Sequence, residues 1–297
     1  GSSGGGSVGI SASVSVVSIG AKLNNDSKES LSNNGSFVDG EISKDFVTGN
    51  LGNSEHTQGI ESMVAGKLTG LNISSYLNET SADSLNKTRA YIGTGAEVTA
   101  DNDITISARD NTKVSILAGG ASAGTVGVGG GVGIATVNTT TEAFAGNNSK
   151  LWAGRNITIE AVNQADGGTQ YSVIAFGGGA GLVGGIGASV AYLDVNNTVR
   201  SYIGTGAEVS KANELKVNST VNNTLKAEAV GASGGVNGAV GASLARANLT
   251  GRAESYLGNS VSVQQTVSIN VRSQWISDIN ATSWAGSTCR RLPTAPN

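Results

Sequence analysis

Four short segments of the chain alternate between apolar or small residues and polar residues with a period of two. A period of two is typical of a β-strand with one buried and one solvated face, whereas a helix would scatter these residues around its circumference. We predict that the four strands stack in register with the first, third and fifth residues of each inward. They are Ile104-Thr105-Ile106-Ser107-Ala108, Ile157-Thr158-Ile159-Glu160-Ala161, Leu215-Lys216-Val217-Asn218-Ser219 and Val267-Ser268-Ile269-Asn270-Val271.

Runs rich in Gly and Ala further upstream show the same alternation with smaller side chains. One face carries a gradient from Gly or Ala to Val or Leu, in Gly133, Ala135 and Val137, in Ala191, Leu193 and Val195, and in Ala245, Ala247 and Leu249. The other face carries Ile134 and Thr136, Tyr192 and Asp194, and Arg246 and Asn248. The persistent size gradient predicts a second set of strands lining a core that narrows at one end.

These segments belong to a repeat marked by an aromatic-aliphatic-Gly triplet. Its aromatic residues, Tyr91, Phe144, Tyr202 and Tyr256, lie 53, 58 and 54 residues apart. Repetition at this scale indicates a solenoid, in which each unit buries its apolar face against its neighbours. We predict an all-β fold, a right-handed parallel β-helix of about four units, with about 20–30 residues per rung and so two rungs per unit. The handedness rests on the preference of parallel crossovers.

Turn-forming residues separate the predicted strands. Asn tolerates left-handed backbone angles, so the Asn-Asn pairs at 147–148, 196–197 and 222–223 predict corners, as does Thr-Gly-Ala at 205–207. Proline occurs only at Pro293 and Pro296, which leaves the backbone N–H groups of the repeats available for ladder hydrogen bonds.

The pattern divides the chain into four parts. We predict a partial unit at 1–23, a polar insertion at 24–89, repeat units at 90–287 and an irregular tail at 288–297. Because the pattern opens and stops within a unit, we expect a fragment of a longer protein.

The insertion interrupts the first unit and differs from the repeats in composition. Segments 59–65 and 81–86 could each form a short helix, the second capped by Ser81. Insertions in solenoids often map to the binding face, so the varied side chains of Glu41, Phe46, His56 and Tyr76 are the candidate partner-binding residues. The alternative is a tolerated surface loop without a partner.

Composition excludes several functional classes. The net charge of −3, with 14% charged residues, lacks the basic surface that follows a phosphate backbone, which argues against nucleic acid as a partner. One Cys and one His leave no disulfide framework and few arrangements for zinc or a catalytic triad.

No motif for a cofactor or catalysis accompanies the repeats. The Gly runs lack the Gly-Lys-Ser/Thr of a phosphate-binding loop, and four copies fit architecture better than catalysis. Asp101, Asp103 and Asp110 do not recur in other units, so we interpret them as solvated turn residues and not as metal ligands. Glu160 is the only acidic residue at the outward positions of the four predicted strands, so they carry no acidic cluster of the kind used by polysaccharide-cleaving enzymes. We expect no catalytic residues, metal or cofactor.

A membrane-active role is the alternative for the Gly runs. The segment from Ile116 to Val137 is long and uncharged, with small residues at the spacing that lets membrane helices approach closely. Glycine is costly in a helix, however, and period-two alternation belongs to strands. The pattern therefore favours a β-core over membrane insertion.

The recurring phrases resemble a known family of exoproteins. A Gly-rich run is followed by Asn-x-Thr-x-x-Tyr-Ile-Gly-x-Gly-Ala-x-Val and then by Asp-Ile-Thr-Ile-x-Ala, a pattern similar to the repeat region of leukotoxin-like filamentous haemagglutinin exoproteins. The stretch from Asn197 to Val209 matches best, and the resemblance covers 90–297, with 4–23 as a partial unit.

The resemblance implies a large adhesin or toxin of Gram-negative bacteria. Such proteins pass through an outer-membrane transporter partner by two-partner secretion and are released or stay at the cell surface as virulence factors. The implied function is a non-enzymatic structural or adhesive shaft segment that meets a host-cell surface or matrix component. The alternative is a membrane-damaging, leukotoxin-like segment. The family's repeats define no catalytic set, so no functional residue is carried over.

Overall fold

The computed structural model describes residues 2–3, 8–20, 87–165 and 169–289. Within these ranges the chain is all-β, with no helix, and its strands join in one 13-stranded network that is parallel throughout. The strands are β1 (Ser2–Ser3), β2 (Val8–Ile19), β3 (Lys87–Ile92), β4 (Glu97–Ala100), β5 (Ile104–Asp110), β6 (Val114–Ala145), β7 (Lys150–Ala153), β8 (Asn156–Gln164), β9 (Tyr171–Ile203), β10 (Glu208–Gly235), β11 (Gly238–Leu257), β12 (Ser262–Val263) and β13 (Thr266–Cys289).

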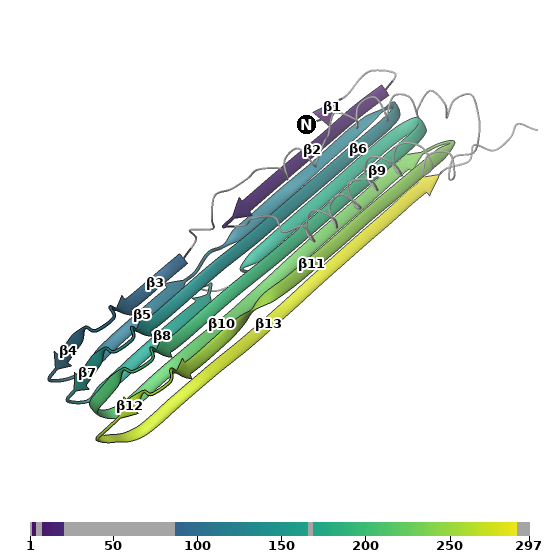
Figure 1. Cartoon of the computed structure of the whole chain (residues 1–297). Coiled ribbons are helices and arrows are strands. Elements are labelled where there is room, and N and C mark those ends of the chain that lie inside the picture. The colour runs from purple at the N-terminus through teal and green to yellow at the C-terminus, as the bar shows by residue number, and fades with distance from the viewer. Residues whose placement is uncertain (1, 4–7, 21–86, 166–168, 290–297) are drawn as a thin grey trace, which may run out of the picture.

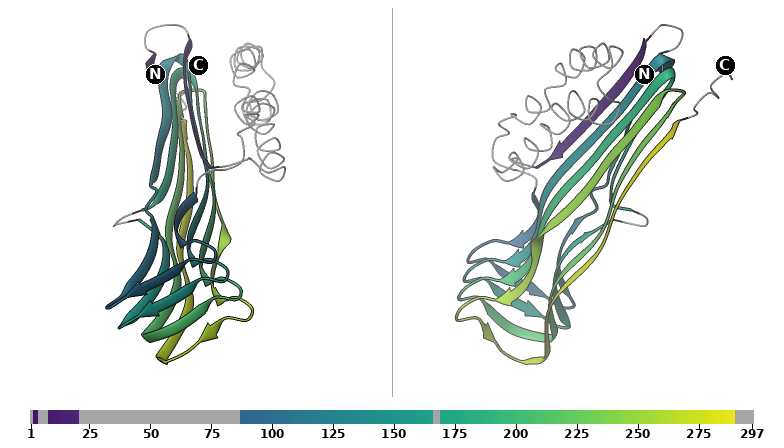
Figure 2. Two further views of the ribbon diagram at one scale, coloured as in Figure 1. Left: turned by 60° about the vertical axis from the view of Figure 1, so that its left-hand side comes forward. Right: turned by 90° about the vertical axis from the view of Figure 1, so that its right-hand side faces the viewer.

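The strands fall into three lines of parallel neighbours. β6 and β9 each bend back at one end of the molecule, so the two parts of each of these strands belong to different lines (Figures 1 and 2). The outbound line contains β5 with 114–124 of β6, β8 with 171–181 of β9, then 212–235 of β10 and β13. The return line contains β2 with β3, then 126–145 of β6, 184–203 of β9 and β11. The bridge line contains β4, β7, 208–209 of β10 and β12.

Each sequence unit contributes one strand run to each line, so one unit makes one layer. Phe144 pairs with Tyr202, and Tyr202 pairs with Tyr256, at the full length of the repeat. The prediction of two rungs per unit is therefore wrong. Most residues of each unit form two long strand runs that lie face to face, so one unit makes a single layer.

The predicted strand register is confirmed for the first three segments. Ile104 pairs with Ile157, and Ile157 with Leu215, and the inward residues of these segments are buried. The fourth segment is shifted by two residues, because Leu215 pairs with Ile269 and not with Val267. Ile269 stands 13 residues after its triplet aromatic, as Leu215 does, whereas Val267 stands 11 after it and is 83% exposed.

The interior tapers from large side chains to none, as the size gradient predicts. Near the bridge line the core contains Ile, Leu and Val, among them Ile157, Ile159 and Leu215. Farther along, the outbound and return lines enclose smaller residues around Tyr171 and Leu193. The register of the Gly/Ala runs is also as predicted, since each residue of one run pairs with its counterpart in the next.

Beyond this second core the two lines touch through their backbones. A Cβ added to Gly177 would lie 2.0 Å from the Ala188 carbonyl oxygen, and one added to Gly231 would lie 2.0 Å from that of Ala242. Stacked sheets normally lie about 10 Å apart, with side chains between them. The inward glycines therefore let the two lines close without an intervening layer of side chains.

The turns before the bridge line repeat in every layer. Each places a residue with positive φ at the same step: Gly95, Asn148, Gly206 or Ser260. Backbone N–H groups in these turns donate to the next layer, as from Gly95 to Asn147 and from Asn148 to Thr205. The turns predicted at 147–148 and 205–207 are thus confirmed.

The turns predicted at 196–197 and 222–223 are wrong, because both pairs lie within strands. Asn197 and Asn223 are fully buried. Their side chains lie in a polar part of the interior. At these two places the Asn-Asn pair therefore indicates a buried polar layer and not a turn between strands.

The inward position of Ile159 gives a direct test of the strand assignment. Ile159→Asp would bury an unpaired carboxylate between Ile106 and Val217, and we expect it to lower the free energy of unfolding by about 4 kcal/mol or more. Thr158→Asp, on the outward face of the same strand, should change it by less than about 1 kcal/mol. Urea unfolding measures both values, and equal effects of the two substitutions would contradict this register.

The backbone contact at Gly177 gives a second test, with its neighbour as a control. Gly177→Ala would drive a methyl group into the Ala188 carbonyl, and we expect a loss of about 2 kcal/mol or more. The nearest heavy atom to a Cβ at Gly178 is 3.7 Å away, so Gly178→Ala should be neutral or stabilise by up to about 1 kcal/mol. Thermal unfolding of both variants measures the contrast, and a tolerated Gly177→Ala would refute the close approach.

Candidate functional site

The outer face of the return line carries a row of stacked aromatic rings. Tyr91, Phe144, Tyr202 and Tyr256 occupy the same position in four successive layers. Their ring centroids lie 5.2, 4.8 and 5.1 Å apart, and the ring planes differ by 9° or less. Burial, and then the negative charge of Glu142, raises the pKa of the Tyr202 hydroxyl. The row of rings results from the in-register pairing of the layers, which places the four aromatic residues beside one another.

Charged residues of alternating sign run beside the rings, two residues earlier in each strand. Arg89 Nε donates to Glu142 Oε2 at 2.6 Å, Arg200 Nη1 lies 3.6 Å from Glu142 Oε1, and Arg200 Nε donates to Glu254 Oε2 at 2.9 Å. Like charges directly opposite each other on paired strands repel, and alternation converts the same stacking into attraction. Arg89, Glu142, Arg200 and Glu254 therefore form an ionic row across all four layers.

The stacking limits what the aromatic row can bind. The faces of Phe144 and Tyr202 are each covered by a ring on both sides, so they offer ring edges and not a flat platform for a ligand. Within the described chain, Tyr91 and Tyr256 each stack on one ring only and are 62% and 42% exposed. Of the four rings, only these two therefore have a face that no other ring of the row covers.

A polar layer lies inside the molecule between the two apolar cores. Asn163 Nδ2 donates to Thr139 Oγ1 at 3.0 Å and to Asp110 Oδ2 at 3.3 Å. Gln170 Nε2 donates to the Tyr171 hydroxyl at 3.0 Å, and Asn197 Nδ2 lies 3.4 Å from the same oxygen. These hydrogen bonds offset part of the cost of removing the groups from water, and those of Asn163 join neighbouring layers. Gln170 Oε1 and both polar side-chain atoms of the buried Asn223 have no hydrogen-bond partner among the described residues.

Asp110 belongs to this layer and is not the solvated turn residue that the sequence predicts. It is 8% exposed and also accepts hydrogen bonds from the backbone N–H and the hydroxyl of Thr112. Asp101 and Asp103 are exposed, as expected. The hydrogen bond from Arg155 holds the pKa of the Asp103 carboxyl below its usual value. The three aspartates thus serve different structural roles.

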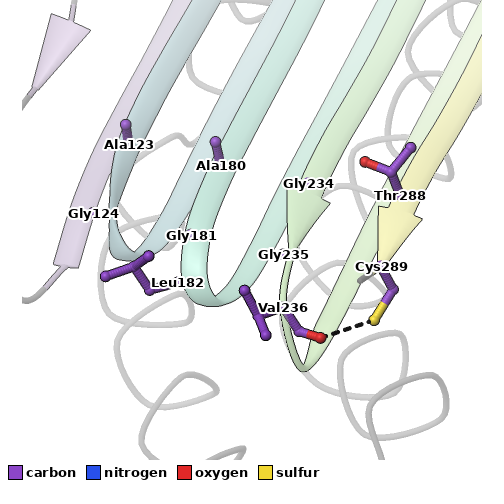
Figure 3. A pocket seen from close by; sticks show the side chains of 10 residues that line it. All are labelled: Ala123, Gly124, Ala180, Gly181, Leu182, Gly234, Gly235, Val236, Thr288 and Cys289. Atoms are coloured by element: carbon purple, nitrogen blue, oxygen red, sulfur yellow. Dashed lines mark hydrogen bonds between the residues drawn. The ribbon is translucent and has the colours of Figure 1, made fainter. Parts of the chain in front are cut away.

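A shallow apolar depression of about 500 Å³ lies where the strands bend back (Figure 3). Ala, Gly and the side chains of Leu182 and Val236 form most of its wall, with Thr288 and Cys289 at one side. The Cys289 thiol donates to the Val236 carbonyl at 3.3 Å. The lining contains no charged group, so it offers no acid, base or nucleophile assembly beyond that single thiol.

The sequence-predicted binding residues Glu41, Phe46, His56 and Tyr76 lie outside the described residues, as do the predicted short helices at 59–65 and 81–86. In the described part, β2 ends at Ile19 and β3 resumes the return line at Lys87. Ile19 pairs with Val137 and Lys87 with Thr140, so the described ends of β2 and β3 are separated by two positions of the neighbouring strand β6. No cluster of three or more His, Cys, Asp or Glu suited to a metal occurs among the described residues.

Neither the aromatic row nor the ionic row is predicted from the sequence, although the sequence contains the signal for both. The aromatic residue of the triplet recurs once in each unit and therefore falls at the same position in every layer. Arg89, Glu142, Arg200 and Glu254 each stand two residues before an aromatic of the triplet. Aligning the units on that aromatic places four charges of alternating sign in one column.

No family model, curated protein or solved structure matches this chain. Among the described residues, no helix has the length and apolar character needed to cross a membrane.

The polar layer predicts a loss of stability at alkaline pH. Burial raises the pKa of Tyr171 to about 12, whereas an unfolded tyrosine has a pKa of about 10. The neutral hydroxyl contributes about 2–3 kcal/mol to the free energy of unfolding. This contribution is complete below pH 10 and is lost as the pH rises to about 12.

Denaturant unfolding at pH 9 and pH 12 measures this loss, and Tyr171→Phe provides the control. The Phe variant has no hydroxyl to ionise here, so its alkaline loss should be smaller than that of the native chain by about 2–3 kcal/mol. An identical pH dependence in the two proteins would show that Tyr171 is not held neutral by burial.

Proposed function

We propose that this chain is a β-solenoid, a right-handed parallel β-helix, that serves as a non-enzymatic structural or adhesive shaft segment. The proposal includes a place at the bacterial cell surface or in a secreted filamentous exoprotein, exported through an outer-membrane transporter. The observation that carries it is the layer register, in which rings, charges and turns recur at equivalent positions in four layers.

Such a register suits a shaft for two physical reasons. Each layer adds about 4.8 Å along the stacking direction and offers the next layer the same edge, so length grows without a new fold. On the outer face the rings of the aromatic row recur in every layer at that spacing, and the charges of the ionic row alternate in sign from one layer to the next. A surface of this kind can engage many weak, equivalent sites on a host-cell surface or matrix component, and avidity then exceeds the affinity of a single contact.

The alternative, a membrane-damaging toxin segment, rests on the uncharged Gly runs and on the family resemblance. The inward glycines of these runs have a structural explanation in the backbone contact between the outbound and return lines. The runs therefore require no membrane to account for their composition. Dye release from liposomes tests this alternative, and leakage caused by the chain at submicromolar concentration would favour the toxin over the shaft.

We expect the chain to bind host cells or extracellular matrix, with specificity in the insertion. The test compares the full chain with a variant in which 24–86 is replaced by a short Gly/Ser connection. Lys87 to Arg89 are kept because they belong to β3 and supply Arg89 of the ionic row. The variant should retain the far-ultraviolet β signal of the native chain and lose attachment.

Two outcomes would count against parts of this proposal. Undiminished attachment of the folded variant would place binding on the repeated outer faces and not in the insertion. Absence of attachment by both proteins, at micromolar concentration and across a panel of cells and matrix proteins, would overturn the adhesive role and leave only the structural one.

A further inference from the structure

The return line carries apolar side chains on both of its faces. Its inward residues, such as Ala135 and Leu193, belong to the second core between the outbound and return lines. The residues that alternate with them point away from the outbound line, and in three neighbouring strands these residues are apolar as well. We call this surface the outer apolar face, formed by Val8, Val14 and Val16 of β2, Val126, Val132 and Ile134 of β6, and Ile186, Val190 and Tyr192 of β9.

The register makes the outer apolar face continuous and gives it a polar border. Val16, Ile134 and Tyr192 lie side by side in three successive layers. In the next layer the guanidinium of Arg246 lies 5.7 Å from the centroid of the Tyr192 ring. Toward the bridge line the same side of the strands continues with the polar residue Asp194. An apolar surface with a polar rim is typical of an interaction site.

The exposed fractions on the outer apolar face are lower than sheet neighbours alone produce. Tyr192 and Phe176 are both outward aromatic residues of β9, on opposite lines, with paired strands on either side. Phe176 is 41% exposed, whereas Tyr192 is 5% exposed and Ile134 is 2% exposed. Among the described residues, the apolar side chains packed against this face come only from the return line and from Val183 at the bend. The described strands therefore do not account for its burial.

Residues 21–86 join the return line beside this face. β2 ends at Ile19, three residues after Val16, and β3 begins at Lys87. Ile19 lies beside Val137 and Lys87 beside Thr140, so the segment between them leaves and rejoins the chain next to the outer apolar face. It needs no long connection to reach that face.

The sequence of this segment contains an apolar stripe that suits a sheet face. Apolar residues recur at a spacing of three or four, which is typical of one side of a helix. They are Ile60, Met63, Val64, Leu68 and Leu71. Ser62 and Thr69 fall on the opposite side of such a helix. Lys67 falls within the stripe, and its long side chain can carry the ammonium to solvent.

We propose that the segment 21–86 packs on the outer apolar face, with the apolar stripe at 60–71 against β6 and β9. The insertion then forms a third layer beside the outbound and return lines, as elements with one apolar side do in two- and three-layer folds. Its polar residues face the solvent on that side of the molecule. The packing is independent of whether the chain is adhesive.

Hydrogen exchange of the full chain gives the first test. In the native chain the amides of 60–71 should exchange at least about tenfold more slowly than in an isolated peptide of the same sequence. Ile134→Lys should remove this protection, because an ammonium would be buried beneath the segment. Ile174→Lys is the matched control: Ile174 is half-buried on the outward face of the outbound line, and protection of 60–71 should persist. The amides of β8 and β9, measured together with them, report whether the strands stay paired.

Substitutions in the segment itself leave the strand ladders untouched and give a second test. Leu68→Lys places a charge in the apolar stripe, so the outer apolar face should become accessible and the fluorescence of an added hydrophobic dye should rise at least about twofold. Thr69→Lys changes the neighbouring residue on the polar side of the stripe. It should leave the fluorescence at the native value.

Photo-crosslinking identifies what covers the face. Tyr192→p-benzoylphenylalanine places a photoreactive ring on the outer apolar face, and Phe176→p-benzoylphenylalanine places the same ring on the outward face of the outbound line. Only the first should crosslink to peptides from 21–86. A mixture of isotope-labelled and unlabelled chains should show that both crosslinked peptides come from one molecule.

Several outcomes would overturn the proposal. These are exchange of 60–71 as fast as in the isolated peptide, equal effects of Ile134→Lys and Ile174→Lys on their protection, equal dye binding by Leu68→Lys and Thr69→Lys, or crosslinks from position 192 that reach only a second copy. Attachment to host surfaces is measured separately, and its absence would leave this packing unaffected.

Discussion

The in-register parallel ladder between layers is the constraint on which the other features of this molecule depend. Because neighbouring strands lie about 4.8 Å apart, each side chain faces its equivalent in the layers above and below. The chain must therefore choose residues that tolerate stacking on their own counterparts. Aromatic rings satisfy this by lying face to face, and the charges of the ionic row satisfy it by alternating in sign from Arg89 to Glu254.

The second constraint is the distance between the outbound and return lines, and the inward residues set it. Ile and Leu hold the lines apart near the bridge line, and glycine lets their backbones meet at the bends. The polar layer around Asn163 and Asn197 lies between the two apolar cores, where side chains from different layers reach one another. The space between the outbound and return lines thus narrows from a filled core to direct backbone contact, while the strands keep the same parallel pairing.

Much of this arrangement could be predicted from the sequence, because alternation and repeat length are local signals. The strands around Ile106, Ile159 and Val217 and their inward faces follow from them. The number of layers per unit does not follow from these local signals, because it depends on how far two strands run before they turn. The shift from Val267 to Ile269 was visible only by counting 13 residues from the aromatic, since the alternating pattern fits both positions.

Other features depend on distant contacts that no local pattern reports. Asn197 resembles a turn residue, but Thr139 lies in register beside it and its hydroxyl donates to the Asn197 side chain, which makes Asn197 a buried partner. The ionic row required comparison of single positions across four units. The predicted binding residues of the insertion stay predictions, since they lie outside the described residues.

Methyl nuclear Overhauser effects can determine whether one repeat unit forms one layer. If it does, contacts are expected from Ile106 to Ile159 and from Ile159 to Val217, with no direct contact between Ile106 and Val217. Contacts between strands separated by half a repeat within one line, or the absence of these full-repeat contacts, would contradict it.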